Sequence, residues 1–231
     1  MARTTETLAR IPLFRSLEAE AIRQLDTQCA WRRASTGQWL IEYQDASTDV
    51  FFVAAGTVHV MIQSAGREVL LRRINAGEFF GELAAIDGQP RSSGIVAVTD
   101  VTIARMPATV FRAAVHAYSD VCDQLLALLA SQIRALANRV NEFSTLDVRT
   151  RIYAELLRLS RPEGGNAGRA IISPPPVHAE IAARVSTRRE AVTRELKTLE
   201  RGGLIERRRG AIVLTDADRL RQLVEEAADE G

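Results

Sequence analysis

A glycine, a carboxylate and an arginine follow one another closely in residues 80–93, FGELAAIDGQPRSS, in an order that suits a ligand made of a sugar and a phosphate. Gly81 lets the backbone approach a ligand closely, and a turn of helix that begins near Glu82 would point free N–H groups at an anion. Glu82 can accept a hydrogen bond from a sugar hydroxyl, and Arg91 can pair with phosphate oxygens through two N–H groups. Ser92 can add a hydroxyl donor. This run therefore predicts a binding site for a sugar phosphate.

The same run resembles the phosphate-binding cassette of cyclic-nucleotide-binding domains, in which Gly-Glu-Leu-Ala is followed by a short gap, a glycine and Pro-Arg. A turn with a surface arginine would account for a lone Gly-Glu-Leu, but the complete spacing favours the cassette. The resemblance implies that Glu82 holds the ribose 2′-hydroxyl and that Arg91 pairs with the cyclic phosphate. The ligand-binding residues that it implies in this run are Gly81, Glu82, Leu83, Ala84, Arg91, Ser92 and Ser93.

The composition excludes several classes of protein. The chain has 231 residues, 46% of them apolar and 26% charged, which is ordinary for a globular protein and enough for two modest domains. Cys29, Cys122 and three scattered histidines have no metal-ligand spacing, so we expect no metal site. No apolar run approaches the roughly 18 residues of a membrane span, and the N-terminus has no apolar signal core. We therefore expect a cytoplasmic protein that does not associate with membranes.

The net charge of +1 conceals a basic segment. Residues 147–215 hold 14 Arg and Lys against 8 Asp and Glu, a local charge of +6, whereas residues 1–146 carry −1 and residues 216–231 carry −4. A locally basic domain is the electrostatic footprint expected of a nucleic-acid partner. An excess of this size is modest, so it supports DNA binding only together with a DNA-binding fold.

Short apolar, β-branched runs separated by glycines occupy residues 31–106. The expected strands are 39–41, 50–53, 58–62, 69–71, 95–98 and 101–103, with turns at Gly37, Gly56, Gly66, Gly77 and Gly88. Such strands predict an antiparallel sandwich or jelly roll. The 80–93 run lies between two of them, and apolar residues at helical spacing predict a short helical segment within residues 6–28.

A long helix is expected after the strands, within a helical pattern that extends from about residue 110 to 142. Over residues 121–143 its apolar positions recur at intervals of four and three: Cys122, Leu126, Leu129, Ile133, Leu136, Val140 and Phe143. This heptad pattern predicts that the helix pairs with its copy in a homodimer. The alternative is a helix that packs one face inside a globular core.

Two short helices are expected in residues 177–201, after a boundary at 141–147. Ser186 and Thr187 form the turn between the helices, and one of the two can cap the second helix. Glycines end that helix at 202–203.

Shorter elements surround this pair of helices. A helix is expected over 148–159, a flexible loop over 161–168 and a brief strand over 170–172. Residues 204–214 predict a β-hairpin wing whose basic residues Arg207 to Arg209 could contact phosphates or be solvated.

The order of these elements is similar to that of the CRP/FNR superfamily of transcription regulators over about residues 10–215. The resemblance implies an α+β chain with a cyclic-nucleotide-binding jelly roll over 1–120, a dimerisation helix and hinge over 121–146, and a winged helix-turn-helix over 147–231. It also implies double-stranded DNA as the partner, cAMP or cGMP as the effector, and no enzymatic activity.

The second helix of the pair resembles the base-reading helix of that family, with Arg189, Glu190 and Arg194 as the reading set. An arginine fork matches O6 and N7 of guanine, and a carboxylate accepts from N4 of cytosine. The resemblance implies GTGA half-sites repeated as an inverted palindrome. An ordinary solvated helix face is the alternative for the arginines taken alone. The implied DNA-binding residues are Thr187, Arg188, Arg189, Glu190 and Arg194, with His178 as a weaker candidate for a phosphate contact.

The long helix departs from the family pattern. Alignment places Leu136 and Ala137 where cAMP-responsive members carry the threonine and serine that reach the adenine, and neither side chain can hydrogen-bond. Polar neighbours that could face the base are Gln132, Arg134, Asn138 and Asn141. The choice between cAMP and cGMP therefore stays open.

The sequence also leaves other functions open. The chain could be a regulator with a different effector or with none. Two cysteines are too few for an FNR-type iron–sulfur sensor, and no motif supports the remaining possibility, an enzyme acting on cyclic nucleotides. By analogy with the family, the 161–168 loop is a candidate contact for RNA polymerase.

Overall fold

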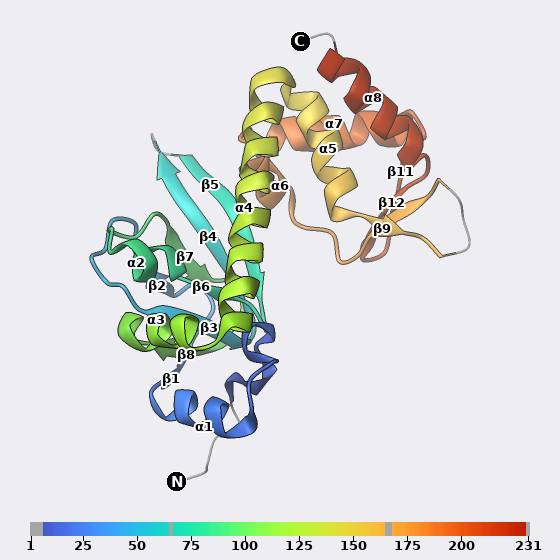
Figure 1. The fold of residues 1–231 in the computed structure, drawn as a ribbon. Helices are drawn as coiled ribbons and strands as arrows, with labels where there is room; N and C mark the ends of the chain where they lie inside the picture. Colours follow the sequence, from blue (N-terminus) through green and yellow to red (C-terminus); the bar gives the residue numbers. More distant parts are fainter. Residues whose placement is uncertain (1–6, 65–66, 165–167, 230–231) are drawn as a thin grey trace. The chain divides into compact units, whose positions relative to one another are not determined.

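The protein is described by a computed structural model over residues 7–64, 67–164 and 168–229. The chain divides into two compact units, residues 1–131 and 132–231 (Figure 1). The division falls inside one long helix, and each unit has its own hydrophobic core. Gly66, one of the expected turn glycines, lies outside the described residues.

The first unit contains two four-stranded antiparallel sheets, so the expected jelly-roll type of sandwich is confirmed (Figure 1). One sheet has the order β1-β8-β3-β6 and the other β2-β7-β4-β5. The strands are β1 Ala30–Ala34, β2 Trp39–Ile41, β3 Val50–Ala55, β4 Thr57–Ser64, β5 Arg67–Asn75, β6 Phe79–Phe80, β7 Gly94–Ala97 and β8 Val101–Met106.

The strand β3 is buried on both faces, which explains its unbroken apolar sequence. Val50 and Phe52 point into a core beneath the helices, and Phe52 lies 5.1 Å from the ring of Phe14. Phe51 and Val53 point into a second core between the two sheets, where the Phe51 ring stacks on Phe80 at 5.1 Å.

The helices of the first unit differ from their predicted extents. The helical segment expected within 6–28 consists of two 3-10 turns, Leu8–Arg10 and Pro12–Phe14, and of α1, Ala19–Thr27. The pattern expected over 110–142 contains two helices, α3 Ala108–Ala117 and α4 Ser119–Thr145. Tyr118 separates them because its backbone is extended, with φ −123° and ψ 104°.

The second unit has the predicted helix-turn-helix and wing. Its elements are α5 Val148–Leu159, β9 Arg161–Pro162, β10 Ala170–Ile172, α6 His178–Arg184, α7 Arg189–Arg201, β11 Ile205–Arg208, β12 Ala211–Leu214 and α8 Ala217–Asp229. The four strands form one antiparallel sheet in the order β11-β12-β10-β9.

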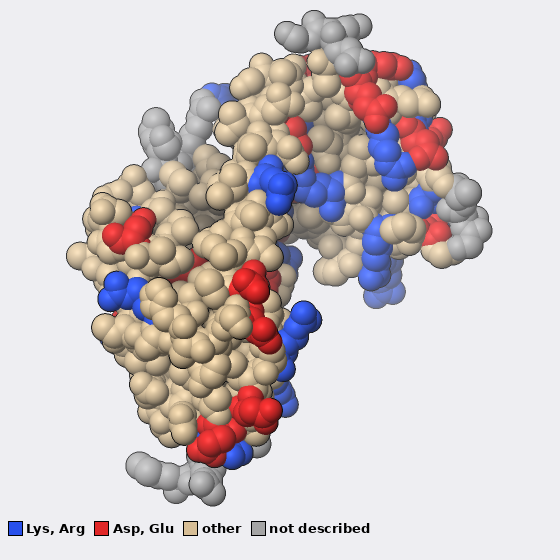
Figure 2. Space-filling model, viewed as in Figure 1, with Lys and Arg blue, Asp and Glu red and all other residues tan. Residues whose placement is uncertain are grey.

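Two elements of this unit were not predicted from the sequence. The start of the expected 161–168 loop forms β9, which pairs with β10. The acidic C-terminal segment forms α8, whose residues Ala217 and Leu220 are buried in the core of the unit. Acidic side chains gather on the outer surface of α8 (Figure 2), where Asp218 and Glu226 are well exposed. Ala217, Leu220, Leu223 and Val224 recur at helical spacing, so the amphipathic pattern of this packed helix is present in the sequence.

A buried carboxylate joins three helices of the second unit. Glu155 of α5 is only 1% exposed, and it pairs with Arg158 and, at 3.3 Å, with Arg184 of α6. Arg184 also pairs with Glu180 at 3.0 Å, and Arg158 pairs with Glu142 of α4. This chain of charges fixes the end of α4 to the first helix of the helix-turn-helix.

Replacement of Glu155 by Gln is expected to lower the free energy of unfolding of the second unit by about 3 kcal/mol, because it removes the buried negative charge that Arg158 and Arg184 share. Chemical denaturation monitored by circular dichroism measures the change. The control is Glu225→Gln on the exposed surface of α8, which should change stability by less than about 0.5 kcal/mol. Equal stability of the two variants would contradict the role given to Glu155.

Candidate functional site

The 80–93 run contains a short helix, α2 Glu82–Asp87, which starts at the residue where the sequence predicted a turn of helix. Gly81 precedes it in the left-handed region, with φ +86°. A Cβ at Gly81 would lie 2.6 Å from Nη1 of Arg91 and 2.8 Å from the carbonyl oxygen of Asp49. The structure therefore gives a definite reason for this glycine: it makes room for the arginine.

The Arg91 side chain is held inside the jelly roll and is 2% exposed. Its Nη1 donates to the carbonyl oxygen of Gly81 at 2.9 Å, its Nη2 to that of Asp49 at 2.7 Å and its Nε to Oγ of Ser47 at 3.1 Å. The guanidinium carbon lies 5.8 Å from the centre of the Phe51 ring. These contacts use three of the five N–H donors of the guanidinium and fix its orientation.

The connection between β2 and β3 encloses Arg91, which sequence reasoning did not anticipate. The Arg91 N–H donates to the carbonyl oxygen of Asp45 at 2.9 Å, and the Gln44 N–H donates to the carbonyl oxygen of Arg91 at 3.0 Å. Ser47 stands 44 positions before Arg91 in the chain, and no local motif connects the two. Ser47 is therefore a site residue that only the fold reveals.

Glu82 is the second buried ionisable group of the site, with an exposure of 7%. Burial raises the pKa of its carboxyl group, while its own backbone N–H and the charges of Arg72 and Arg91 act in the opposite direction. Burial likewise lowers the pKa of Arg91, against the pull of the Asp45, Asp49 and Glu82 carboxylates. The site thus has a hydrogen-bond acceptor and a fixed cation, the pair that a sugar phosphate requires.

The other predicted ligand residues take varied positions. Ala84 is buried, Leu83 is 45% exposed, Ser92 is exposed and Ser93 is half-buried. Leu136 and Ala137 are exposed residues of α4 in the second unit.

The heptad positions of α4 leave an apolar stripe in solvent. Leu126, Ile133, Leu136 and Val140 are each more than half exposed, which is unusual for large apolar side chains on a single helix. Within α4, the buried residues are Val121 and Leu125. At these four positions the alternative of a heptad face inside the core is therefore wrong, whereas Leu129 packs against the core of the first unit.

The turn of the helix-turn-helix differs from its prediction in one respect. Ser186 adopts a positive φ of +52°, and the Thr187 N–H donates to the carbonyl oxygen of Ala182 at 2.9 Å. Arg188, not Ser186 or Thr187, is the N-cap residue of α7, and its side chain makes no capping hydrogen bond. The predicted capping role is wrong because Ser186 and Thr187 both precede the N-cap position, which Arg188 occupies.

The outward face of α7 carries the predicted base-reading residues. Val192, Leu196 and Leu199 are buried, whereas Arg189 and Arg194 are exposed. A shallow hollow follows this face and is lined by Arg189, Glu190, Thr193, Arg194, Lys197, Glu200 and Arg201.

His178 contacts α7 within the unit. Its Nδ1 lies 2.8 Å from Oγ1 of Thr193, and the ring is half-buried. Burial lowers the pKa of His178, and the charges of Arg207 and Arg189 lower it further. The imidazole is therefore neutral at neutral pH, with one nitrogen already committed to Thr193.

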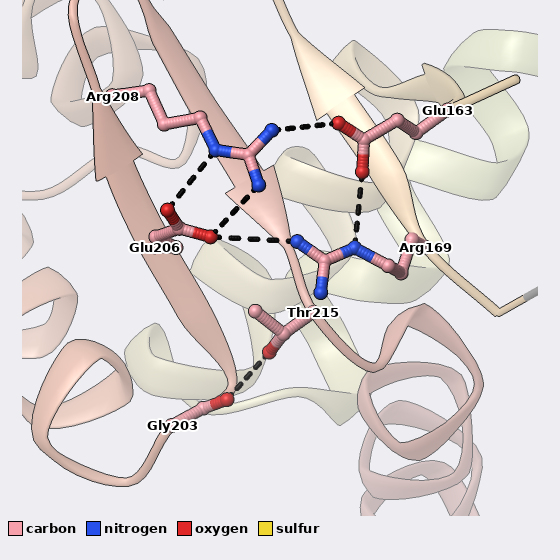
Figure 3. Close-up of polar contacts among 6 residues, drawn as sticks. All are labelled: Glu163, Arg169, Gly203, Glu206, Arg208 and Thr215. Atoms are coloured by element: carbon pink, nitrogen blue, oxygen red, sulfur yellow. Dashed lines mark hydrogen bonds and ion pairs between the residues drawn. The ribbon is translucent and has the colours of Figure 1, made fainter. Parts of the chain in front are cut away.

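The wing contains a closed ring of ion pairs (Figure 3). Arg208 donates to Glu206 through Nε and Nη2, both at 3.0 Å, and to Glu163 at 2.8 Å. Arg169 completes the ring with contacts of 3.0 Å to Glu163 and 3.4 Å to Glu206. Of the three wing arginines, Arg208 is therefore neutralised within the domain.

Two family models match the chain: the cyclic nucleotide-binding domain over residues 31–118 and the Crp-like helix-turn-helix domain over residues 150–223. The chain belongs to the CRP/FNR superfamily. It is a CRP-like transcription regulator that combines a cyclic nucleotide-binding domain with a helix-turn-helix domain.

Curated members of the CRP/FNR superfamily match most of the chain. A CRP-like cAMP-activated global transcriptional regulator of Mycobacterium tuberculosis is 27% identical over 217 residues, which cover 93% of this chain and 97% of the relative. The cAMP-activated global transcriptional regulator CRP of Escherichia coli O157:H7 is 28% identical over 181 residues, 78% of this chain and 86% of the relative.

Solved structures confirm the CRP/FNR fold. A CooA mutant from Carboxydothermus hydrogenoformans superposes with a TM-score of 0.80 at 20% identity, over 97% of this chain and 98% of that one. The c-di-GMP-responsive global regulator CLP of Xanthomonas campestris superposes with a TM-score of 0.69 at 22% identity, over 85% of this chain and 99% of that one.

Within the described part of the chain, no group of three or more His, Cys, Asp or Glu side chains is placed to hold a metal ion. In the same residues, no helix is long and apolar enough to span a membrane.

Replacement of Gly81 by Ala is expected to destabilise the first unit by more than the same change at Gly88. Both glycines have positive φ, +86° and +71°, but only at Gly81 would the new Cβ meet other atoms. The cost at Gly88 should be about 1 kcal/mol from backbone strain alone. Denaturation measures the free energy of unfolding of both variants, and the additional loss in Gly81→Ala reports the displacement of Arg91. Equal losses in the two variants would show that the close contact between Gly81 and Arg91 does not contribute to stability.

Proposed function

We propose that the protein is a homodimeric transcription regulator that binds a cyclic nucleotide, cAMP or cGMP, and then binds a palindromic DNA site with GTGA-type half-sites. The observation that carries the proposal is the buried pair of Glu82 and Arg91, placed in a chain that also exposes Arg189, Glu190 and Arg194 on one helix. Such a regulator acts in the cytoplasm, and no enzymatic activity is required of it.

The cassette recognises the part that all cyclic nucleotides share. Arg91 pairs with the cyclic phosphate through the donors that its protein contacts leave over, and Glu82 accepts from the ribose 2′-hydroxyl. Leu83, Ala84, Ser92 and Ser93 complete the ligand-binding run. The relatives named above support cAMP, but Leu136 and Ala137 offer no polar side chain to an adenine.

The exposed stripe of α4 supports the homodimer through residues 121–143. Large apolar side chains at heptad spacing gain stability when they pair with the same stripe of a second copy. In such a dimer the two α7 helices read two half-sites about one DNA turn, roughly 34–36 Å, apart. The nucleotide acts by favouring the DNA-competent arrangement through its differential affinity for that state.

DNA recognition rests on α7. Arg189 and Arg194 each fork onto a guanine, and Glu190 accepts from a cytosine amino group. Thr187 and Arg188, at the start of this helix, contact phosphates. His178 is a poorer phosphate contact than its position suggests, because one ring nitrogen is engaged by Thr193. By analogy with the family, the 161–168 loop is the candidate contact with RNA polymerase, and its residues 165–167 lie outside the described residues.

A second candidate is a regulator of the same fold with another effector or none. It is favoured by the apolar Leu136 and Ala137 and by the variety of regulators that share this fold. Titration of the protein with cAMP and with cGMP, each followed by measurement of DNA affinity, separates the two candidates. If neither nucleotide binds and DNA affinity does not change, the second candidate replaces the first.

Arg91→Ala is expected to weaken the binding of cAMP and cGMP about 100-fold, because two charge-assisted hydrogen bonds to phosphate are worth about 3 kcal/mol together. Isothermal titration calorimetry measures the affinities, and circular dichroism checks that the variant is folded. Arg112→Ala on the exposed surface of α3 is the matched control and should bind like the wild type. Unchanged affinity in Arg91→Ala would exclude the cassette as the phosphate site.

Arg189→Ala is expected to cost about 1–3 kcal/mol on a GTGA palindrome and to relax the choice of base at one guanine. Fluorescence anisotropy on sites with each base at that position gives both effects. Arg219→Ala is the control, because it removes the same charge from α8, a helix that bears no predicted DNA contact. The affinity of this variant for DNA should equal that of the wild type. Equal binding of Arg189→Ala and the wild type to all sites would remove Arg189 from the reading set.

A further inference from the structure

The base-reading face of α7 contains Thr193, a residue outside the predicted reading set. Thr193 is one turn after Arg189 and directly before Arg194, and it lines the same surface hollow as both arginines. The side chain carries two groups that a base could meet, a hydroxyl and a methyl. The contacts within the domain decide which of the two is available.

The hydroxyl of Thr193 is already engaged on the protein side. Oγ1 donates to the carbonyl oxygen of Arg189 at 3.0 Å, one turn back along α7, and lies 2.8 Å from Nδ1 of His178 on α6. A threonine in a helix chooses between side-chain rotamers partly through such a bond to the preceding turn. The contact with His178 on α6 stabilises the same rotamer. The methyl group is therefore the part of the Thr193 side chain that is available to a ligand in the hollow.

His178 acts as the positioning residue for this contact. The single proton of the Thr193 hydroxyl is donated to the Arg189 carbonyl, so the hydrogen bond to His178 requires that Nδ1 carry the proton. A half-buried imidazole flanked by Arg189 and Arg207 favours the neutral ring. A neutral ring protonated on Nδ1 meets that requirement without adding charge beside the arginines.

We propose that Thr193 reads the 5-methyl group of a thymine in the DNA half-site, with its rotamer set by His178. The proposal rests on the proposed function, since it requires that α7 enter the major groove. In that groove thymine is the base that presents a methyl group, and a threonine methyl is a suitable apolar partner for it. Arginines on both sides of Thr193 read guanines, so the geometry points to a thymine next to a guanine, as in GTGA.

The test uses DNA duplexes that differ from the site by one methyl group. Each half-site contains two thymines, one in GTGA and one opposite its adenine, and each is replaced in turn by deoxyuridine in both half-sites. Affinities are measured by fluorescence anisotropy with the full-length protein under the nucleotide condition that gives the tightest DNA binding. The wild type should bind about 15-fold more weakly at one of the two uracil positions, as expected for the loss of two buried methyl groups, one in each half-site.

Three variants assign the effect to named atoms. Thr193→Ser keeps the hydroxyl and removes the methyl, so it should bind thymine and uracil sites equally. Thr193→Val keeps a methyl in every rotamer and should retain the discrimination. His178→Ala should reduce the discrimination toward that of Thr193→Ser, which a purely structural role of His178 would not do.

The outcomes separate this inference from the proposed function. If the wild type binds the thymine and uracil duplexes equally at both positions, or if Thr193→Ser discriminates as well as the wild type, the thymine contact is overturned although DNA binding stands. Unchanged discrimination in His178→Ala would overturn the positioning role. If the wild type shows no preference for the GTGA palindrome over a scrambled duplex, the proposed function itself fails.

Discussion

The buried guanidinium of Arg91 is the interaction on which the geometry of the 80–93 run depends. Arginine does not lose its charge in proteins, so a side chain that is 2% exposed must find acceptors for its N–H groups. It finds them on Ser47 and on the carbonyl oxygens of Asp49 and Gly81. This requirement accounts for the missing Cβ at Gly81 and for the course of the β2–β3 connection, which passes around the arginine. An anion that binds here therefore meets a cation whose position the fold has already set.

The second unit uses its charges for two separate purposes. Arg158, Arg169, Arg184 and Arg208 belong to the basic segment, yet each is paired with carboxylates of the same unit. Their charges stabilise the fold and are not available to DNA. Exposed cations such as Arg189 and Arg194 on α7 and Arg209 on the wing are left to a partner, so the count of 14 Arg and Lys in this segment overstates the number of cations that can contact phosphates or bases.

The long helix α4 belongs to both units. Val121 and Leu125 near its start are buried in the core of the first unit. Near its end, Arg139 donates to the carbonyl oxygen of Arg184 and Glu142 pairs with Arg158, which ties the helix to the helix-turn-helix of the second unit.

The sequence by itself determined the class of fold, because alternation in strands, heptads in α4 and the two short helices with their wing all depend on local spacing. The ligand-binding role of Gly81, Glu82 and Arg91 and the base-reading role of α7 stay predictions from the same kind of spacing. Sequence reasoning did not predict α8 or the N-cap at Arg188. Only the tertiary structure brought Ser47 to Arg91 and His178 to Thr193. Those contacts join segments far apart in the chain, and the positions of such partners follow from how the elements pack, which the spacing of residues along the chain does not record.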